Sequence, residues 1–163
     1  MSESEFILRP IAYVRSPRTE PTDDFWGNVV AEIELCPDVP TESLDGLEEY
    51  SHAEIVFLFH RVSPDNVVTG ARHPRDNPAY PRVGIFAHRA KDRPNRLGST
   101  IVRILGREGR TLRVLALDAI DGTPVLDIKP VMTEFLPREP VRQPEWTHEK
   151  MVDYWRSVDA TKK

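Results

Sequence analysis

Most of the 163-residue chain consists of short apolar runs that are separated by turn residues. In VVAEIEL, the apolar residues Ala31, Ile33 and Leu35 alternate with glutamates, which is the period of a strand with one exposed face. AEIVFLFH is apolar at successive positions, so we expect a central, buried strand that leads into His60. Many short strands with few helical patterns between them favour an antiparallel sandwich or a closed barrel over an α/β fold.

Further strands are expected at FILRPIAYVR (residues 6–15), VGIFAH, STIVRILG, TLRVLALD and PVLDIKP. Pro10 places the first strand at a sheet margin, because proline has no amide hydrogen for an inner ladder. Gly106 and Gly109 suit a hairpin loop between STIVRILG and TLRVLALD. TESLDGLEEY is expected to form a short helical turn. The connection over residues 62–82 contains four prolines and is expected to be irregular, as long functional loops often are.

The pattern changes near the end of the sequence. Pro144 and Glu145 suit a first helical turn. Apolar side chains then recur at helical spacing, at Met151, Val152, Trp155 and Val158. The sequence therefore predicts an amphipathic C-terminal helix over about residues 144–158, which packs on the strands or on a second subunit.

Length and composition indicate one domain over residues 1–163, because this length can bury a core but is short for two domains. Cys36 is the single cysteine, which excludes an internal disulfide. No stretch is long and apolar enough to cross a bilayer, and MSESEFILRP is unlike a signal peptide. We therefore expect a cytoplasmic protein without a membrane partner.

Charge is unevenly distributed along the chain. The net charge is −4, but residues 72–113 hold 11 Lys and Arg against 3 Asp and Glu, so this segment carries +8 and the remainder −12. A basic face on an acidic protein is the pattern expected of a chain that meets phosphates on one side. Pairing of these arginines with carboxylates elsewhere in the fold is the alternative.

Candidate chemistry is concentrated in residues 84–130, which contain GIFAHR, the loop RAKDRPNRLG and the turn AIDGTP. Asp121 and Gly122 permit positive φ, so that successive amides of this turn can point toward an acceptor atom. The five histidines are scattered and no cysteine pair occurs, so no metal site is expected. The sequence has no GxSxG, and no GxGxxG between a strand and a helix, which disfavours a Rossmann-type enzyme.

IAYVRSP, LDGLEEYSHAEIVFLFH, GIFAHR, RPN, LG and DGTPVLDIKP follow one another in this order. In these blocks, over roughly residues 6–132, the chain resembles the TrmO/YaeB-like family of S-adenosylmethionine-dependent methyltransferases. The resemblance implies an antiparallel closed β-barrel over about residues 6–132. It also implies methylation of threonylcarbamoyladenosine beside the anticodon of tRNA, by a homodimer whose cofactor pocket is completed by the second subunit. The chain looks like the short form, without the extra C-terminal domain of longer bacterial members.

Site residues follow from the resemblance. It implies cofactor contacts from Phe59, His60, Arg89, Leu97, Ala119, Ile120, Asp121 and Gly122. Arg89 is expected to pair its planar guanidinium with the carboxylate of S-adenosylmethionine. From the residues alone, a structural ion pair is the favoured interpretation of Arg89, and His60 suits a buried core position equally well.

Arg93, Asn95 and Arg96 are the expected contacts to the acceptor, with both arginines exposed toward phosphates. Asp118, Asp121 and Asp127 all remain open as groups that assist deprotonation. Asp23 and Asp24 lie in PTDDFWG, where many family members have PRQ, and RPNRLG replaces RPNPIG. These departures leave two alternatives to a tRNA enzyme: a methyltransferase for a small molecule, or a noncatalytic barrel that binds a nucleotide or RNA.

Overall fold

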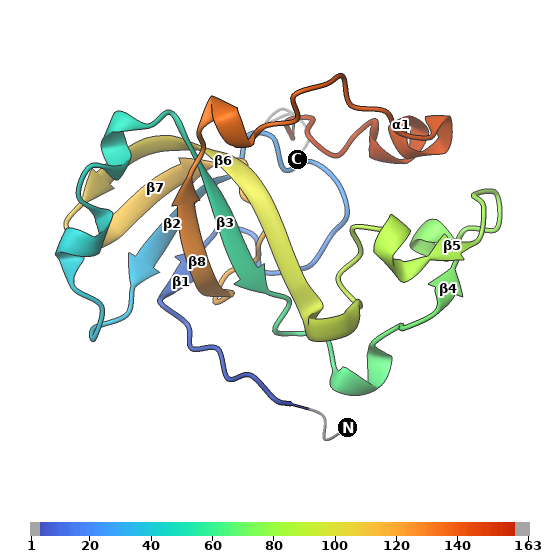
Figure 1. Ribbon diagram of the computed structural model, residues 1–163, viewed down its shortest axis with the longest axis horizontal. Helices are drawn as coiled ribbons and strands as arrows, with labels where there is room; N and C mark the ends of the chain where they lie inside the picture. Colours follow the sequence, from blue (N-terminus) through green and yellow to red (C-terminus); the bar gives the residue numbers. More distant parts are fainter. Residues whose placement is uncertain (1–3, 159–163) are drawn as a thin grey trace.

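Strands with alternating apolar residues close into a six-stranded antiparallel barrel in the computed structural model, which describes residues 4–158 (Figure 1). Around the barrel the order is β1, β2, β7, β6, β3 and β8, and β8 pairs with β1 again. The barrel strands are β1 (Ala12–Arg15), β2 (Val30–Leu35), β3 (His52–Leu58), β6 (Leu97–Glu108), β7 (Thr111–Leu115) and β8 (Pro124–Pro130). The closed antiparallel barrel expected from the sequence is therefore confirmed.

Side chains alternate along each strand, so every second residue points into the barrel. Val14 lies opposite Ile33, and Ile33 lies opposite Leu112 on the next strand, so successive inward residues meet in layers. The barrel core contains buried residues from all six strands, among them Val14, Ile33, Ile55, Val102, Leu112 and Val125. Apolar burial of this kind is the main favourable term in folding, at roughly 25 cal/mol for each Å² removed from water.

Strand direction gives the barrel two different ends. β3 and β7 finish at the end where β6 and β8 begin, and we call this the loop end. The loop end carries the long connections over residues 16–29, 59–96 and 116–123. The opposite end carries the β6–β7 hairpin and two 3₁₀ turns, Thr41–Leu44 and Leu47–Glu49. Among residues 4–158, no helix has the length and hydropathy needed to span a membrane.

The small sheet of β4 (Ala71–Arg72) and β5 (Val83–Gly84) and the helix α1 (Glu145–Met151) lie to the right of the barrel in Figure 1. β4 and β5 form a separate two-stranded sheet within the 59–96 connection. The same connection contains the 3₁₀ turns Pro64–Asn66, Pro74–Asp76, Ile85–Ala87 and Pro94–Arg96, and a further turn, Thr133–Phe135, follows β8. The C-terminal helix α1 lies beside β4 and β5, where Trp146 meets Tyr80 with ring centroids 6.0 Å apart.

Two expected elements are shorter than the sequence pattern indicated. The first strand begins at Ala12, and Phe6, Ile7 and Leu8 stay exposed before it. The C-terminal helix is present but ends at Met151, because Asp153 and Tyr154 then turn their carbonyl groups to the amides of the 16–29 connection. The apolar stripe predicted for this helix is consequently split, with Val152, Trp155 and Val158 all about half exposed or more.

Candidate functional site

The segments expected to form the site come together at the loop end. β3 ends at Leu58, directly opposite Leu97, so Phe59 and His60 leave the barrel beside the first residue of β6. β8 pairs with β3 on its other side, which brings the turn over residues 119–122 to the same end. Barrel topology therefore gathers segments that are far apart in the sequence.

Phe59 and Leu97 lie where β3 passes into β6. The amide of Phe59 donates to the Arg96 carbonyl at 2.8 Å, which continues the ladder one residue beyond the strand. The Phe59 ring meets Phe57 edge to face, with centroids 5.3 Å apart. Gly98 leaves room for both rings, because a Cβ there would come within 2.5 Å of Phe57 and 3.0 Å of Phe59. The exit of β3 is thus lined by a fixed aromatic pair.

His60 is half-buried at this exit. Burial lowers the pKa of its imidazole, and the neighbouring positive charge of Arg61 lowers it further. Both effects disfavour the imidazolium, so the ring is neutral near pH 7. A neutral ring can accept or donate a hydrogen bond without placing a second cation in the site.

Arg89 follows a segment that differs from the expected strand. VGIFAH is extended only at Val83–Gly84 and then forms a 3₁₀ turn, with Ile85 buried. Arg89 therefore does not end a barrel strand; it lies beside β6, where its Nη2 donates to the Ser99 carbonyl at 2.5 Å. The side chain is exposed, and its guanidinium makes no other hydrogen bond or ion pair within residues 4–158. Its remaining N–H groups are available to an anion.

Arg93 and Arg96 were expected to be exposed, and this expectation is wrong. Both are half-buried, and each guanidinium caps a backbone carbonyl: Arg93 donates to His88 at 2.7 Å and Arg96 donates to Val62 at 2.6 Å. Asn95 between them is exposed, in a left-handed conformation with φ of 63°. The two arginines hold the loop together, while Asn95 remains open to a partner.

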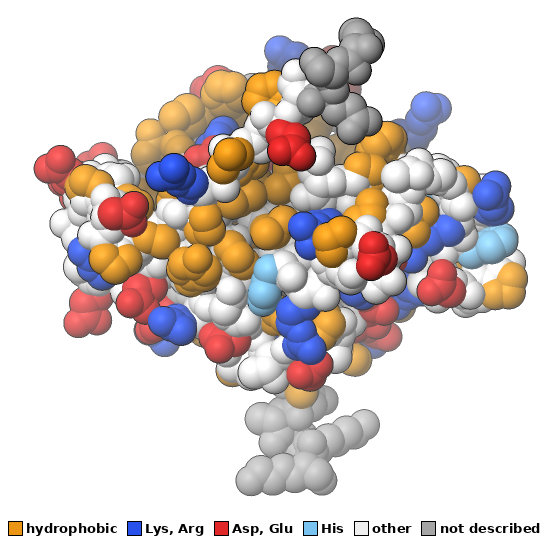
Figure 2. Space-filling model, turned by 90° about the horizontal axis from the view of Figure 1, so that it is seen from below, with side chains coloured by type: hydrophobic (Ala, Val, Ile, Leu, Met, Phe, Trp, Pro, Cys, Tyr) orange, Lys and Arg blue, Asp and Glu red, His pale blue; other side chains and the backbone are white. Residues whose placement is uncertain are grey.

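The other cations of residues 72–113 separate into two groups. Arg72, Arg75 and Arg107 pair with carboxylates, and Arg110 caps backbone carbonyls. Arg82, Lys91, Arg103 and Arg113 are exposed and have no side-chain partner within the described part of the chain. On the face shown in Figure 2, positively charged side chains gather near the middle, beside a histidine. The basic surface is therefore smaller than the +8 of the segment suggests.

The AIDGTP turn has the conformation that the sequence predicts, with Gly122 at φ of 78°. Its amides are already used, however: Asp121 donates to Arg18 and Gly122 donates to Val14, both at 2.8 Å. The Asp121 carboxylate accepts from the Ser16 amide at 3.0 Å. Ala119 and Ile120 are buried. The expectation that these amides bind a ligand atom is therefore wrong for Asp121 and Gly122, and the turn instead fixes the start of β8 against β1.

Asp118 precedes this turn and is held by two hydroxyl groups. Thr100 donates to one carboxylate oxygen and Tyr154 donates to the other. Burial, and then the Asp118 carboxylate, raises the pKa of Tyr154 well above its usual value, although Arg89 opposes the shift. The contact links β6, the turn before β8 and the C-terminal segment. Sequence reasoning missed Tyr154, because nothing local to YWRSV indicates a partner 36 positions away.

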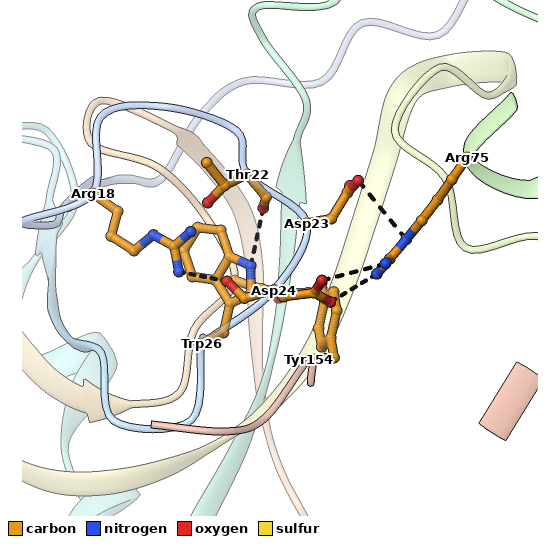
Figure 3. A network of polar contacts seen from close by, with 8 residues as sticks. Arg18, Thr22, Asp23, Asp24, Trp26, Arg75 and Tyr154 are labelled. Atoms are coloured by element: carbon orange, nitrogen blue, oxygen red, sulfur yellow. Dashed lines mark hydrogen bonds and ion pairs between the residues drawn. The ribbon is translucent and has the colours of Figure 1, made fainter. Parts of the chain in front are cut away.

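A loop of the 16–29 connection completes this end of the barrel (Figure 3). The Arg18 guanidinium stacks on the Trp26 ring, 3.8 Å from its centroid, and donates to the Asp24 and Phe25 carbonyls. Asp24 pairs with Arg75 at 2.8 Å, and Asp23 lies 3.8 Å from the same guanidinium. Arg75 therefore cancels one of the two negative charges, and the exposed Asp23 carboxylate keeps this loop acidic.

Fold and site together define a closed six-stranded antiparallel barrel that collects its polar connections at one end. Over residues 15–135 the chain matches the tRNA-methyltransferase O N-terminal domain. It belongs to this family, and the resemblance carried by its motifs is confirmed.

Individual relatives agree with this assignment. The chain is 36% identical over 139 residues to a "Probable S-adenosyl-L-methionine-binding protein" of Pyrococcus abyssi, covering 82% of this chain and 72% of that protein. It is 42% identical over 96 residues to the mouse tRNA (adenine(37)-N6)-methyltransferase, covering 59% of this chain and 22% of the mouse protein. A crystal structure of TrmO from P. aeruginosa superposes with a TM-score of 0.71 at 32% identity, covering 89% of this chain and 63% of that one. The chain thus spans less than two thirds of the solved TrmO and under a quarter of the mouse enzyme.

Proposed function

We propose that this chain is an S-adenosylmethionine-dependent methyltransferase that methylates N6 of adenine 37 in tRNA. The observation that carries the proposal is the gathering of Phe59, His60, Arg89 and Leu97 at one end of a barrel that superposes on TrmO. Relatives named for S-adenosylmethionine binding and for adenine 37 methylation support it.

The residues at the loop end fit the parts of S-adenosylmethionine. Arg89 has free N–H groups for a carboxylate, and a planar guanidinium can bind one with two hydrogen bonds. Phe59 and Leu97 offer half-buried apolar surface beside it, and the neutral His60 adds no positive charge near a sulfonium. Asp121 would contribute through its side chain or carbonyl group, and Gly122 through its carbonyl group, since both amides already donate within the chain.

S-adenosylmethionine supplies an electrophilic methyl group on a sulfonium. Transfer to nitrogen needs mainly alignment, and the rigid end of β3 and start of β6 provide surfaces for that. The acceptor nitrogen also loses a proton. Of the three carboxylates that the sequence left open, Asp127 pairs with Lys129 and Asp121 accepts from the Ser16 amide. Asp118 accepts from Thr100 and Tyr154, so all three carboxylates already have partners and all three stay candidates for this proton.

The resemblance further implies threonylcarbamoyladenosine as the modified base. Asp23 and Asp24 had suggested a small-molecule acceptor; Arg75 cancels only one of their two negative charges, so a small-molecule methyltransferase is kept as the alternative. Exposed cations close to the loop end, Lys91 among them, suit an RNA acceptor. A tRNA substrate also agrees with the cytoplasmic location expected from the sequence.

The test is transfer of a labelled methyl group to tRNA, followed by mass spectrometry of its nucleosides. Two tRNA preparations are compared, one carrying threonylcarbamoyladenosine at position 37 and one carrying unmodified adenosine. Methylation of the first alone supports the full proposal, and methylation of both shows that the carbamoyl group is not recognised. Tight cofactor binding without transfer to either RNA would refute it and favour a small-molecule acceptor.

A further inference from the structure

A cavity of about 400 Å³ lies beside the candidate site, between the exit of β3 and the loop that follows Arg89. Two of its lining residues are neighbours of site residues in the chain: Arg61 follows His60, and Lys91 lies two positions after Arg89. Asn66 and Arg72 also line it. Neither the expected cofactor contacts nor the expected acceptor contacts include these four residues.

The walls of this cavity are fixed by hydrogen bonds. Arg72 binds the Asp92 carboxylate with both terminal nitrogens, at 2.6 and 2.7 Å, and the Val68 amide donates to the Asp92 carbonyl at 2.8 Å. On the other side, Arg96 caps the carbonyl of Val62, which is itself buried. A fork of two charged hydrogen bonds is among the strongest and most directional pairings in proteins. Hydrogen bonds within the 59–96 connection therefore fix the positions of the residues that line the cavity.

The charge of the cavity is positive. Asp92 is neutralised by Arg72, so this pair forms a wall with no net charge. Lys91 has no partner within residues 4–158. Nη1 of Arg61 donates to the Thr19 carbonyl at 2.8 Å. The one carboxylate that pairs with Arg61 among the described residues, that of Glu20, is 3.5 Å away and largely exposed. The unused N–H groups of Arg61 and the ammonium of Lys91 can both serve one anion.

We propose that this cavity binds a backbone phosphate of the RNA, next to the nucleotide that is methylated. Arg61 and Lys91 supply the charge, and Asn66 supplies a neutral amide. The proposal rests on the proposed function, since it assumes that the acceptor is RNA. A phosphate fits better than a base, because the lining offers cations and an amide donor but no aromatic ring.

This assignment gives different roles to residues that share a charge. Arg96 acts as a positioning residue, because its guanidinium donates to the Val62 carbonyl and so holds that wall of the cavity. Arg61 and Lys91 take the role that the sequence suggested for Arg93 and Arg96. Direct contact predicts a change in salt dependence, whereas a purely structural role predicts a change in stability.

The experiment compares the parent with the Arg61→Gln, Lys91→Gln double variant, both as full chains. Arg103→Gln, Arg113→Gln is the matched control, since it removes two exposed, unpartnered cations from β6 and β7. Affinity for tRNA is measured by fluorescence anisotropy between about 50 and 200 mM salt, where phosphate contacts weaken steeply. Cofactor affinity and thermal unfolding are measured on the same samples.

We expect the Arg61, Lys91 variant to bind tRNA at least about tenfold more weakly and to lose about 0.7 to 0.9 from the slope of log K against log salt, as expected for one phosphate contact. Its cofactor affinity should stay within about twofold of the parent. An unchanged slope, or a loss equal to that of the control, overturns the proposal. Lys91→Gln alone, at an exposed position without partners, should lose about half of the slope change and covers the case in which Arg61→Gln unfolds.

Two outcomes separate this proposal from the proposed function. If the parent methylates tRNA and the double variant binds RNA like the parent, the phosphate site is refuted and the enzyme assignment stands. If the parent binds cofactor but neither binds nor methylates tRNA at low salt, both are refuted.

Discussion

The ring of Phe57 occupies the space that a side chain on Gly98 would need, since a Cβ there would lie 2.5 Å from two of its ring carbons. Phe57 is 1% exposed and cannot move away without disturbing the core. Gly98→Ala should therefore lower the free energy of unfolding by about 1 to 3 kcal/mol, the usual cost of overpacking. Urea unfolding measures the change.

Gly84→Ala is the control for this prediction. Gly84 has an ordinary φ of −59°, and a Cβ there would meet nothing within 4 Å. Gly84→Ala should leave stability unchanged or raise it slightly, because alanine restricts the unfolded chain. Equal losses in the two variants would show that the Phe57 ring does not decide the effect.

Arg89→Ala should weaken binding of S-adenosylmethionine by about 1.5 to 3 kcal/mol, the scale of a hydrogen bond to a charged group. The barrel should remain folded, because the exposed guanidinium makes a single hydrogen bond in the described chain, to the Ser99 carbonyl. Isothermal titration measures the affinity, and Arg82→Ala, an exposed arginine without partners in the described chain, serves as the control. A folded Arg89→Ala protein with parental affinity would exclude this arginine from the cofactor site.

Tyr154→Phe should lower stability at pH 7 by about 1.5 to 3 kcal/mol, because Asp118 loses a hydroxyl donor. The parent should also lose stability as the pH rises above about 10, since the unfolded tyrosine then ionises while the folded one keeps its proton. This part of the alkaline loss should be missing in the variant. Denaturant unfolding between pH 7 and 11 measures both effects.

Tyr13→Phe, at an exposed tyrosine of β1, is the control for this pH dependence. In an absorbance titration of the parent, Tyr154 should remain un-ionised until the barrel unfolds. If all tyrosines of the folded protein ionise near pH 10, the buried contact between Tyr154 and Asp118 is contradicted.

A symmetric dimer is expected, because the family resemblance implies a cofactor pocket completed by a second subunit and the C-terminal segment exposes Val152 and Trp155. Light scattering should give twice the chain mass of 18.7 kDa. Val152→Asp should shift the protein toward monomers and weaken cofactor binding, whereas Phe6→Asp, at an exposed residue before β1, should do neither. A monomeric parent that binds the cofactor tightly would contradict this expectation.

The barrel strands were predictable because their signal is local. Ala31, Ile33 and Leu35 alternate with glutamates in the sequence and point into the core in the structure. The hairpin before Thr111 and the turn at Gly122 were equally readable, since glycine marks the positive φ that each requires.

The errors arose where distant partners decide the conformation. VGIFAH has the apolar pattern of a strand, yet the Ile85 amide donates to Gly70 and the chain turns there. Arg96 looked exposed because its acceptor, the Val62 carbonyl, lies 34 positions earlier. The helical pattern near Trp155 continues after Met151, but the Tyr154 carbonyl bonds to the Trp26 amide instead. None of these contacts can be predicted from the spacing of apolar and polar residues in the sequence.

Closure of the barrel depends on two residue pairs, Ala12 with Val125 and Tyr13 with Pro124. During synthesis, β1 and β3 leave the ribosome long before β8. Until β8 emerges, the edge of each strand that pairs with β8 has no partner. Such edges invite wrong pairing between neighbouring chains, and contacts so distant in sequence form slowly. Nascent chains halted before residue 124 should thus remain protease-sensitive and depend on chaperones, and resistance should appear only once β8 has emerged.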